Sequence, residues 1–293
     1  MHLILTVGEV VAPVFFLAII GFVWVRMGFD YQIEFVTRMA MTLSIPCLIF
    51  VALMETEIPP AALTTLSLAT VVAYAAVTAA MLALVAVFRL DMRTYLAPLI
   101  FGNTGNLGLP LALFAFGAEG LGYAVVVFAI MAIYSFTIGI WMVAGGGSPL
   151  KALKEPLVWG TLLGALFLWQ DWQTPTFLTN TLDLIGQLAI PLMLITLGVA
   201  VARLSPKSLG MPLVLSVLKA VACIGLAWAT GAWFGLPPVA LAVLILQVAT
   251  PVAVTSYLLA AKYGADADAV ASLVVVSTTL SVLTLPLVLA FVI

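Results

Sequence analysis

Residues Phe101–Pro110 read FGNTGNLGLP and interrupt a span that is otherwise apolar from Leu96 to Phe116. Glycine loosens a helix, asparagine competes with the backbone for hydrogen bonds, and a proline cannot donate to the preceding turn. At membrane depth, unwound backbone persists only where it is buried in protein or lines a watery cavity. The stretch therefore predicts a helix broken at mid-membrane, with its second half starting at Pro110. A glycine/proline kink in a continuous helix is the alternative.

The composition is that of an all-α polytopic membrane protein. The chain is 65% hydrophobic and 8% charged, whereas soluble domains carry about 25% charged residues. Its length suits about ten spans of roughly 20 residues, and it has no basic stripe for nucleic acid. We expect the lipid bilayer as its surroundings and ten transmembrane helices. These are predicted at Leu3–Val25, Ile33–Leu53, Leu63–Phe88, Leu96–Phe116, Leu121–Val143, Pro156–Trp169, Thr181–Ala202, Leu209–Phe234, Pro238–Ala261 and Ala267–Ile293.

Basic residues at the span ends predict the orientation. All of them but Lys219 fall on one side of the predicted membrane, and the positive-inside rule places that side in the cytoplasm. These residues are Arg26, Arg38, Arg89, Arg93, Lys151, Lys154, Arg203, Lys207 and Lys262. The chain is therefore expected in the cytoplasmic (inner) membrane, with both termini outside.

Prolines spaced at similar intervals indicate an internal repeat. The pairs are Pro13 with Pro156, Pro46 with Pro191, and Pro110 with Pro251, separated by 143, 145 and 141 residues. The halves, 1–145 and 150–293, would each hold five spans, and an odd number inverts one half relative to the other. Inverted repeats with broken helices at matching positions are typical of secondary carriers.

The ninth span carries the second predicted break, Gln247–Ser256. In an inverted repeat the breaks of spans four and nine would cross, bringing two half-helix N-termini together at Pro110 and Pro251. Such ends favour an anion by about 0.3–1 kcal/mol each at exposed sites. Neither break has a carboxylate to hold a cation, so the chemistry suits a carboxylate substrate. The candidate substrate-binding residues are Asn103, Thr104, Asn106, Pro110, Gln247, Thr250, Pro251, Thr255, Ser256 and Lys219.

Lys219 is the one charge predicted deep within a span. It lies 11 residues after Ser208, or about 16 Å along a helix, near the middle of a ~30 Å hydrocarbon core. Charges at this depth are costly and usually functional, so Lys219 could hold the anion or couple transport to a proton. Alternatively, its long side chain snorkels to an interface.

The residues Ala12–Leu17, Ser44–Phe50 and the Asn-x-x-Asn-x-Gly-x-Pro run from Asn103 to Pro110 resemble the auxin efflux carrier family. That family includes bacterial transporters of malonate or malate and the plant PIN auxin carriers. The resemblance covers nearly the whole chain and implies a bile-acid-symporter-like fold with an elevator mechanism. Spans one, two, six and seven would form a scaffold and homodimer contact, and spans three to five and eight to ten the moving transport domain. The long cytoplasmic loop of many plant carriers is missing, so the chain resembles the short bacterial type.

Three functions remain open from the sequence. The favoured one is a carrier for small organic anions, and the others are a cation/proton antiporter on a related fold and a membrane ligand sensor. The only histidine is His2, so no metal site is expected, and no cofactor is implied. The motifs of zinc proteases and serine hydrolases are missing, so an enzyme is not predicted.

Overall fold

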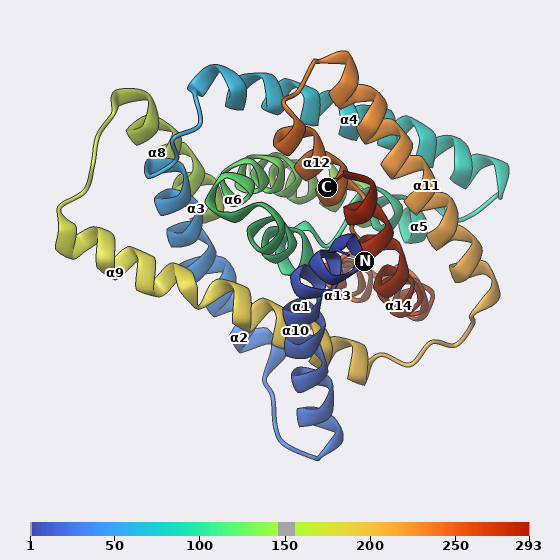
Figure 1. Cartoon of the computed structure of the whole chain (residues 1–293). Coiled ribbons are helices and arrows are strands. Elements are labelled where there is room, and N and C mark those ends of the chain that lie inside the picture. The colour runs from blue at the N-terminus through green and yellow to red at the C-terminus, as the bar shows by residue number, and fades with distance from the viewer. Residues whose placement is uncertain (1, 146–155, 293) are drawn as a thin grey trace.

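The computed structural model describes residues 2–145 and 156–292, and every regular element within those ranges is a helix (Figure 1). Seven stretches are long and apolar enough to cross a membrane, and α8 (Pro156–Gln170) and α12 (Pro238–Val248) are shorter apolar helices. The described part of the chain is thus all-helical, as in a multi-pass membrane protein. The count of ten spans stays a prediction.

The helices follow the predicted spans closely, although several spans are divided. The elements of the first half are α1 His2–Arg26, α2 Ile33–Met39, the π-helical turn η1 Ala40–Ser44, α3 Ile45–Met54, α4 Pro60–Val87, α5 Met92–Ile100, η2 Thr104–Gly108, α6 Leu109–Tyr134, η3 Ser135–Gly139 and α7 Ile140–Ala144. Those that follow α8 are α9 Thr176–Gln187, α10 Ala189–Arg203, α11 Gly210–Trp233, α12, α13 Val254–Tyr263 and α14 Ala267–Val292.

One predicted span end differs from the structure by five residues, whereas the predicted division between spans four and five, after Phe116, is confirmed. The seventh span begins at Thr176 instead of Thr181, because Pro175 precedes it in an extended conformation and sets its first turn. The backbone of α6 is non-helical at Gly117 (φ 63°, ψ −150°), which divides this element into two helices, 109–116 and 118–134. The chain folds sharply there, since a Cβ on Gly120 would lie 2.5 Å from the carbonyl oxygen of Ala112. The possible start of span six near Lys151 lies outside the described residues.

The position of the first break corrects the prediction about Pro110. The non-helical residues are Phe101–Asn103, and the chain is helical again from Thr104, six residues before the proline. Pro110 occupies the second position of α6, directly after the wide turn η2, just as Pro46 follows η1. A widened turn can accommodate a proline ring that an α-helical turn would exclude. Pro110 therefore sits inside a helix and does not hold the break open.

The helices form two groups with α6 between them. Figure 1 shows α3, α8 and α9 together at the left and α4, α5 and α11 at the upper right. In the first group α3 packs on α8 and α9, and α1 packs along α10. A Cβ on Gly198 of α10 would lie 1.7 Å from the carbonyl oxygen of Ala18 in α1, so the two backbones touch. In the second group α11 packs on α4, α12 and α14, while α6 contacts α3, α4 and α12.

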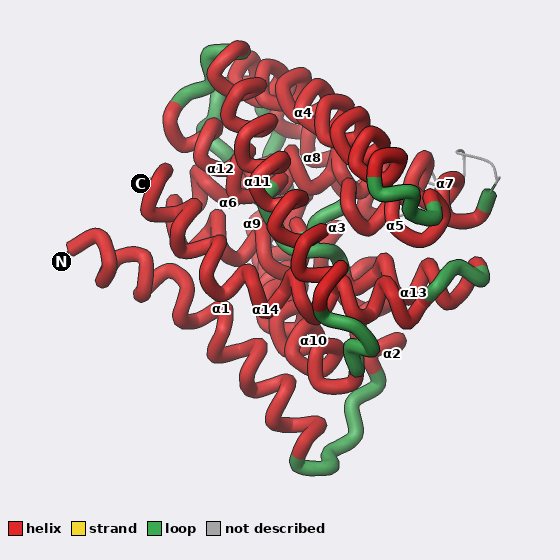
Figure 2. Tube along the Cα trace, turned by 90° about the vertical axis from the view of Figure 1, so that its right-hand side faces the viewer, coloured by secondary structure: helices red, strands yellow, loops and turns green. Residues whose placement is uncertain are grey.

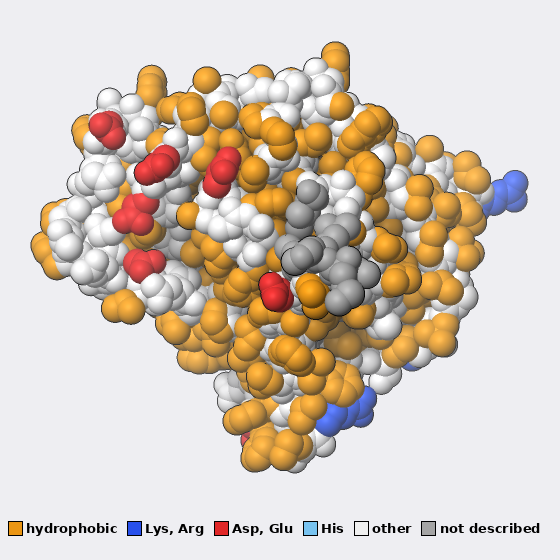
Figure 3. All heavy atoms as spheres, in the orientation of Figure 1, with side chains coloured by type: hydrophobic (Ala, Val, Ile, Leu, Met, Phe, Trp, Pro, Cys, Tyr) orange, Lys and Arg blue, Asp and Glu red, His pale blue; other side chains and the backbone are white. Residues whose placement is uncertain are grey.

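The start of α1 and the end of α14 lie on the same side of the molecule (Figure 2). Figure 3 views that face: acidic side chains gather on its left half, and basic side chains appear only at its margins. The basic side chains are therefore sparse on the face that carries the two chain ends, and the orientation of that face stays a prediction. Lys151 and Lys154 lie outside the described residues.

Candidate functional site

The two breaks meet inside the molecule. Gly102 forms an isolated antiparallel β-bridge with Val252. The backbone N–H of Asn103 donates to the carbonyl oxygen of Pro251 (2.7 Å), and that of Ala253 donates to Phe101 (3.4 Å). The two unwound segments approach so closely that a Cβ on Gly102 would lie 2.2 Å from Oγ1 of Thr250. We call the two breaks with their flanking residues, Phe101–Asn106 and Gln247–Thr255, the crossover.

Two half-helices begin at the crossover. Asn103 precedes η2 and α6, and its carbonyl oxygen accepts from the N–H of Leu107 (3.0 Å). Ala253, in an extended conformation, precedes α13. The first N–H groups of a helix lack intrahelical acceptors and carry its positive dipole end. The crossover thus presents two anion-attracting helix ends, at Asn103 and Ala253 rather than at the two predicted prolines.

Two small cavities lie beside these ends, one of about 50 Å³ and one of about 30 Å³. Both are lined by Met41, Asn106 and Thr255, and Asn103 also lines the larger one. Neither lining includes a charged residue. Since a water molecule takes up about 30 Å³ of liquid, each of these spaces holds only one or two waters. A whole dicarboxylate would need the surrounding helices to separate.

Unpartnered polar atoms concentrate at the crossover. Nδ2 of Asn103, Oγ1 of Thr104 and both side-chain polar atoms of Gln247 are buried without a hydrogen-bond partner in the described part of the chain. Gln247 lies against the backbone of η2, because a Cβ on Gly108 would be 2.0 Å from its Oε1. Buried polar groups of this kind are usually satisfied by water or a ligand.

The structure separates the predicted site residues into two sets. Asn103, Asn106 and Thr255 line the cavities, whereas Thr104, Gln247 and Thr250 are fully buried in the crossover. Pro251 lies in the second break, and Pro110 lies inside α6. Ser256 lines a narrow space of about 10 Å³ together with Arg93 and Phe101.

Lys219 is also at the crossover, but it does not line either cavity. Its side chain is 2% exposed, and Nζ donates to the carbonyl oxygen of Thr250 (3.2 Å) and lies 3.9 Å from Sγ of Cys223. These contacts are incompatible with a side chain that snorkels to an interface. Whether Lys219 also contacts substrate stays a prediction.

Several residues around the crossover were not predicted from the sequence. Met41 of η1 and Met193 and Thr196 of α10 line the cavities, and so does Phe128 of α6. Oγ of Ser277 accepts from the N–H of Val252 (3.1 Å) and so supports the second break from α14. The run Ser277–Thr279, three hydroxyl residues within an apolar span, was a usable signal for that contact.

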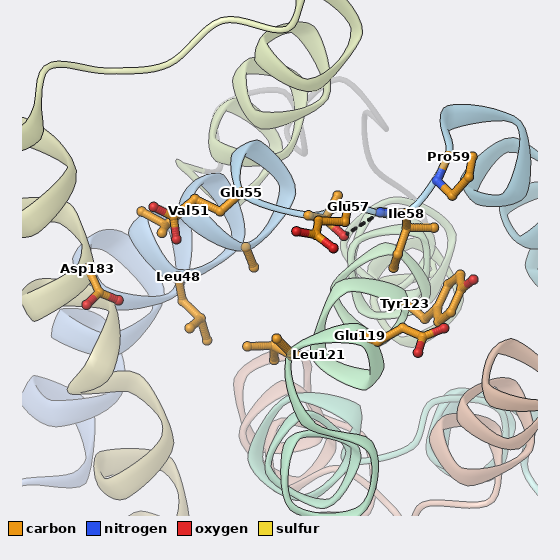
Figure 4. Close-up of a pocket in the computed structure, with 13 residues that line it drawn as sticks. Leu48, Val51, Glu55, Glu57, Ile58, Pro59, Glu119, Leu121, Tyr123 and Asp183 are labelled. Carbon is orange, nitrogen blue, oxygen red and sulfur yellow. Dashed lines mark hydrogen bonds between the residues drawn. The ribbon is translucent and has the colours of Figure 1, made fainter.

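A larger pocket opens elsewhere, between α3 and α9 on one side and α6 on the other (Figure 4). It has a volume of about 580 Å³ and apolar walls that include Leu48 and Leu121. Its acidic residues are Glu55, Glu57, Glu119 and Asp183. Among the described residues no group of three or more His, Cys, Asp or Glu is arranged to hold a metal ion. The pocket thus lies between the first helix group and α6.

Comparison with known proteins agrees with this architecture. A family model described as "Membrane transport protein" matches residues 6–152 and 146–289. An uncharacterized transporter of Methanocaldococcus jannaschii is 28% identical over 204 residues, which cover 64% of each chain. An uncharacterized transporter of Methanothermobacter thermautotrophicus is 32% identical over 200 residues, which cover 63% of each chain. The chain thus spans somewhat under two thirds of the length of these curated relatives.

Proposed function

Because the chain belongs to the membrane transport protein family, which is the auxin efflux carrier family that its motifs resemble, we propose that it is a carrier for small organic anions. The substrates would be carboxylates such as malonate, malate or auxin-like acids. They would cross the cytoplasmic membrane by secondary active or facilitated transport.

The observation that carries this proposal is the pair of half-helix N-termini beside cavities shared by Asn106 and Thr255. A carboxylate placed there would meet backbone N–H groups and two positive dipole ends. The amide of Asn106 can donate a hydrogen bond to it, because that side chain makes no hydrogen bond within the described residues. Without a carboxylate in the lining, the site has no protein anion with which to hold a cation. These features favour an anion carrier over a cation/proton antiporter.

An elevator movement between the two helix groups fits the size of the cavities. Met41, Met193 and Thr196 belong to the group containing α1, α2, α3 and α8–α10, whereas Asn106 and Thr255 belong to the crossover. The substrate space therefore lies between the groups, and a change in their relative position would enlarge it on one side at a time. In the proposal, ten spans in two inverted repeats build this device, the first group is the scaffold and homodimer contact, and both termini face outward.

Flux of labelled malonate into and out of proteoliposomes tests the function, with malate and an auxin-like acid as competitors. Asn106→Ala removes one hydrogen bond to a charged group, which is worth about 1.5–3 kcal/mol, so affinity should fall roughly 10- to 100-fold. Its matched control is Asn180→Ala, an exposed asparagine on α9, which should leave flux unchanged. Equal affinity in the two variants would show that the substrate does not bind at the crossover. If none of the three acids is transported, the proposed substrate class is rejected.

A further inference from the structure

Lys219 is a buried lysine that makes no ion pair within the described part of the chain. Its hydrogen-bond partners are the carbonyl oxygen of Thr250 and the thiol of Cys223. The one ion pair among the described residues joins Lys207 to Asp268, at the surface. A buried ammonium without a counter-charge is costly, so something other than an acidic side chain must offset its charge.

The carbonyl end of a broken helix supplies that offset. Helix α12 ends at Val248, and its negative dipole end points into the break that contains Thr250. The last carbonyl groups of a helix have no intrahelical donor, and the carbonyl oxygen of Thr250 lies just beyond them. The second break thus separates charge: the N-terminus of the half-helix α13 borders the cavities, while the carbonyl oxygen of Thr250 receives the ammonium of Lys219.

In carriers built on broken helices, unwound carbonyl groups and half-helix C-terminal ends hold the coupling cation, while half-helix N-termini hold the anionic substrate. We propose that the ammonium of Lys219 is a tethered cation in that position, so that this carrier needs no bound Na⁺ to complete its crossover. Lys219 is then a positioning residue for the second break and not a ligand of the substrate. This inference rests on the proposed function in one respect: that function assigns the helix N-termini of the crossover to an anionic substrate.

The position of Lys219 supports this role over direct substrate binding. Its side chain reaches the crossover from α11, and it lines neither of the cavities that Asn106 and Thr255 share. Among the described residues, the one oxygen to which it donates belongs to the backbone of the break. Removing the ammonium should therefore leave a vacant, electronegative space beside Thr250 that a small cation can enter.

The test measures thermal unfolding of the purified protein in NaCl and in choline chloride at equal ionic strength. The wild-type midpoint should be the same in both salts, because the tethered ammonium already fills the place. Lys219→Ala should unfold at a lower temperature in choline chloride and regain several degrees in NaCl. Lys219→Met, whose side chain fills the space without charge, should show no difference between the salts. Lys262→Ala, at the exposed end of α13, is the control for loss of a positive charge.

A midpoint of the wild type that rises specifically in NaCl would overturn the inference, and so would a Lys219→Ala protein indifferent to the cation. If Lys219→Ala does not fold, Lys219→Gln replaces it, and the wild-type comparison still applies. Malonate flux measured in the two salts separates the claims. If malonate flux requires Na⁺, the tethered cation is contradicted and the proposed function stands. If no flux occurs but the unfolding midpoints follow the expected pattern, the proposed function is contradicted and the tethered cation stands.

Discussion

Gly102→Ala should damage the crossover, because Gly102 faces Thr250 at close range. The new Cβ would lie 2.2 Å from Oγ1 and 3.0 Å from the carbonyl oxygen of Thr250. Rotating Oγ1 away would break its hydrogen bond to the carbonyl oxygen of Gln247 (2.7 Å), at about 0.5–1.5 kcal/mol. The contact with the carbonyl oxygen would remain, and overpacking of this kind costs about 1–3 kcal/mol. We therefore expect a loss of about 2–4 kcal/mol in the free energy of unfolding.

Thermal or denaturant unfolding, followed by the fluorescence of the seven tryptophans, measures this loss, and malonate flux measures its effect on function. Gly225→Ala is the matched control, because a Cβ there meets nothing within 4 Å and alanine favours the helix. Thr250→Ala in the same chain should recover part of the loss by removing Oγ1, which a double-mutant cycle detects as coupling. The close approach of the two breaks would be refuted if the Gly102→Ala protein were as stable as the Gly225→Ala protein. It would also be refuted if the effects of Gly102→Ala and Thr250→Ala on the free energy of unfolding were additive.

Three further outcomes are expected. Pro110→Ala should retain most of the flux, because the break lies at Phe101–Asn103. Loss of flux in this variant would show that Pro110 does hold the break open. In a cysteine-free background, a cysteine at Glu57 should react with an impermeant reagent from outside and one at Lys262 should not, and the opposite pattern would invert the topology. The hydrogen bond to Asp268 raises the pKa of Lys207, so the pair stabilises the fold below the ordinary lysine pKa of 10.5 and stops doing so as pH passes the raised value. Lys207→Ala should accordingly lower the unfolding midpoint slightly at neutral pH, more in low salt, and not at strongly alkaline pH; a difference independent of pH would exclude the ion pair as its cause.

Much of this protein could be predicted from local sequence. Long apolar runs can only be membrane helices when their backbone must bond to itself, so most helix ends fall within a few residues of their predicted positions. The polar residues Asn103–Asn106 and Gln247–Thr255 marked the two interrupted spans, because such residues are costly in hydrocarbon unless they serve a break or a site. Membership in a transporter family was likewise visible in these motifs.

The tertiary structure decided where within those spans the helix stops. Proline seemed the natural breaking point, yet at Pro110 a π-helical turn accommodates the ring and the helix continues. The break occurs at Gly102 because Val252, 150 residues away, pairs with it there. The same contact determines which polar side chains reach the cavities and which are enclosed, and it gives Lys219 a carbonyl oxygen to bind. A sequence read one span at a time does not contain this information, because each helix break is stabilised by hydrogen bonds to the break in the other span.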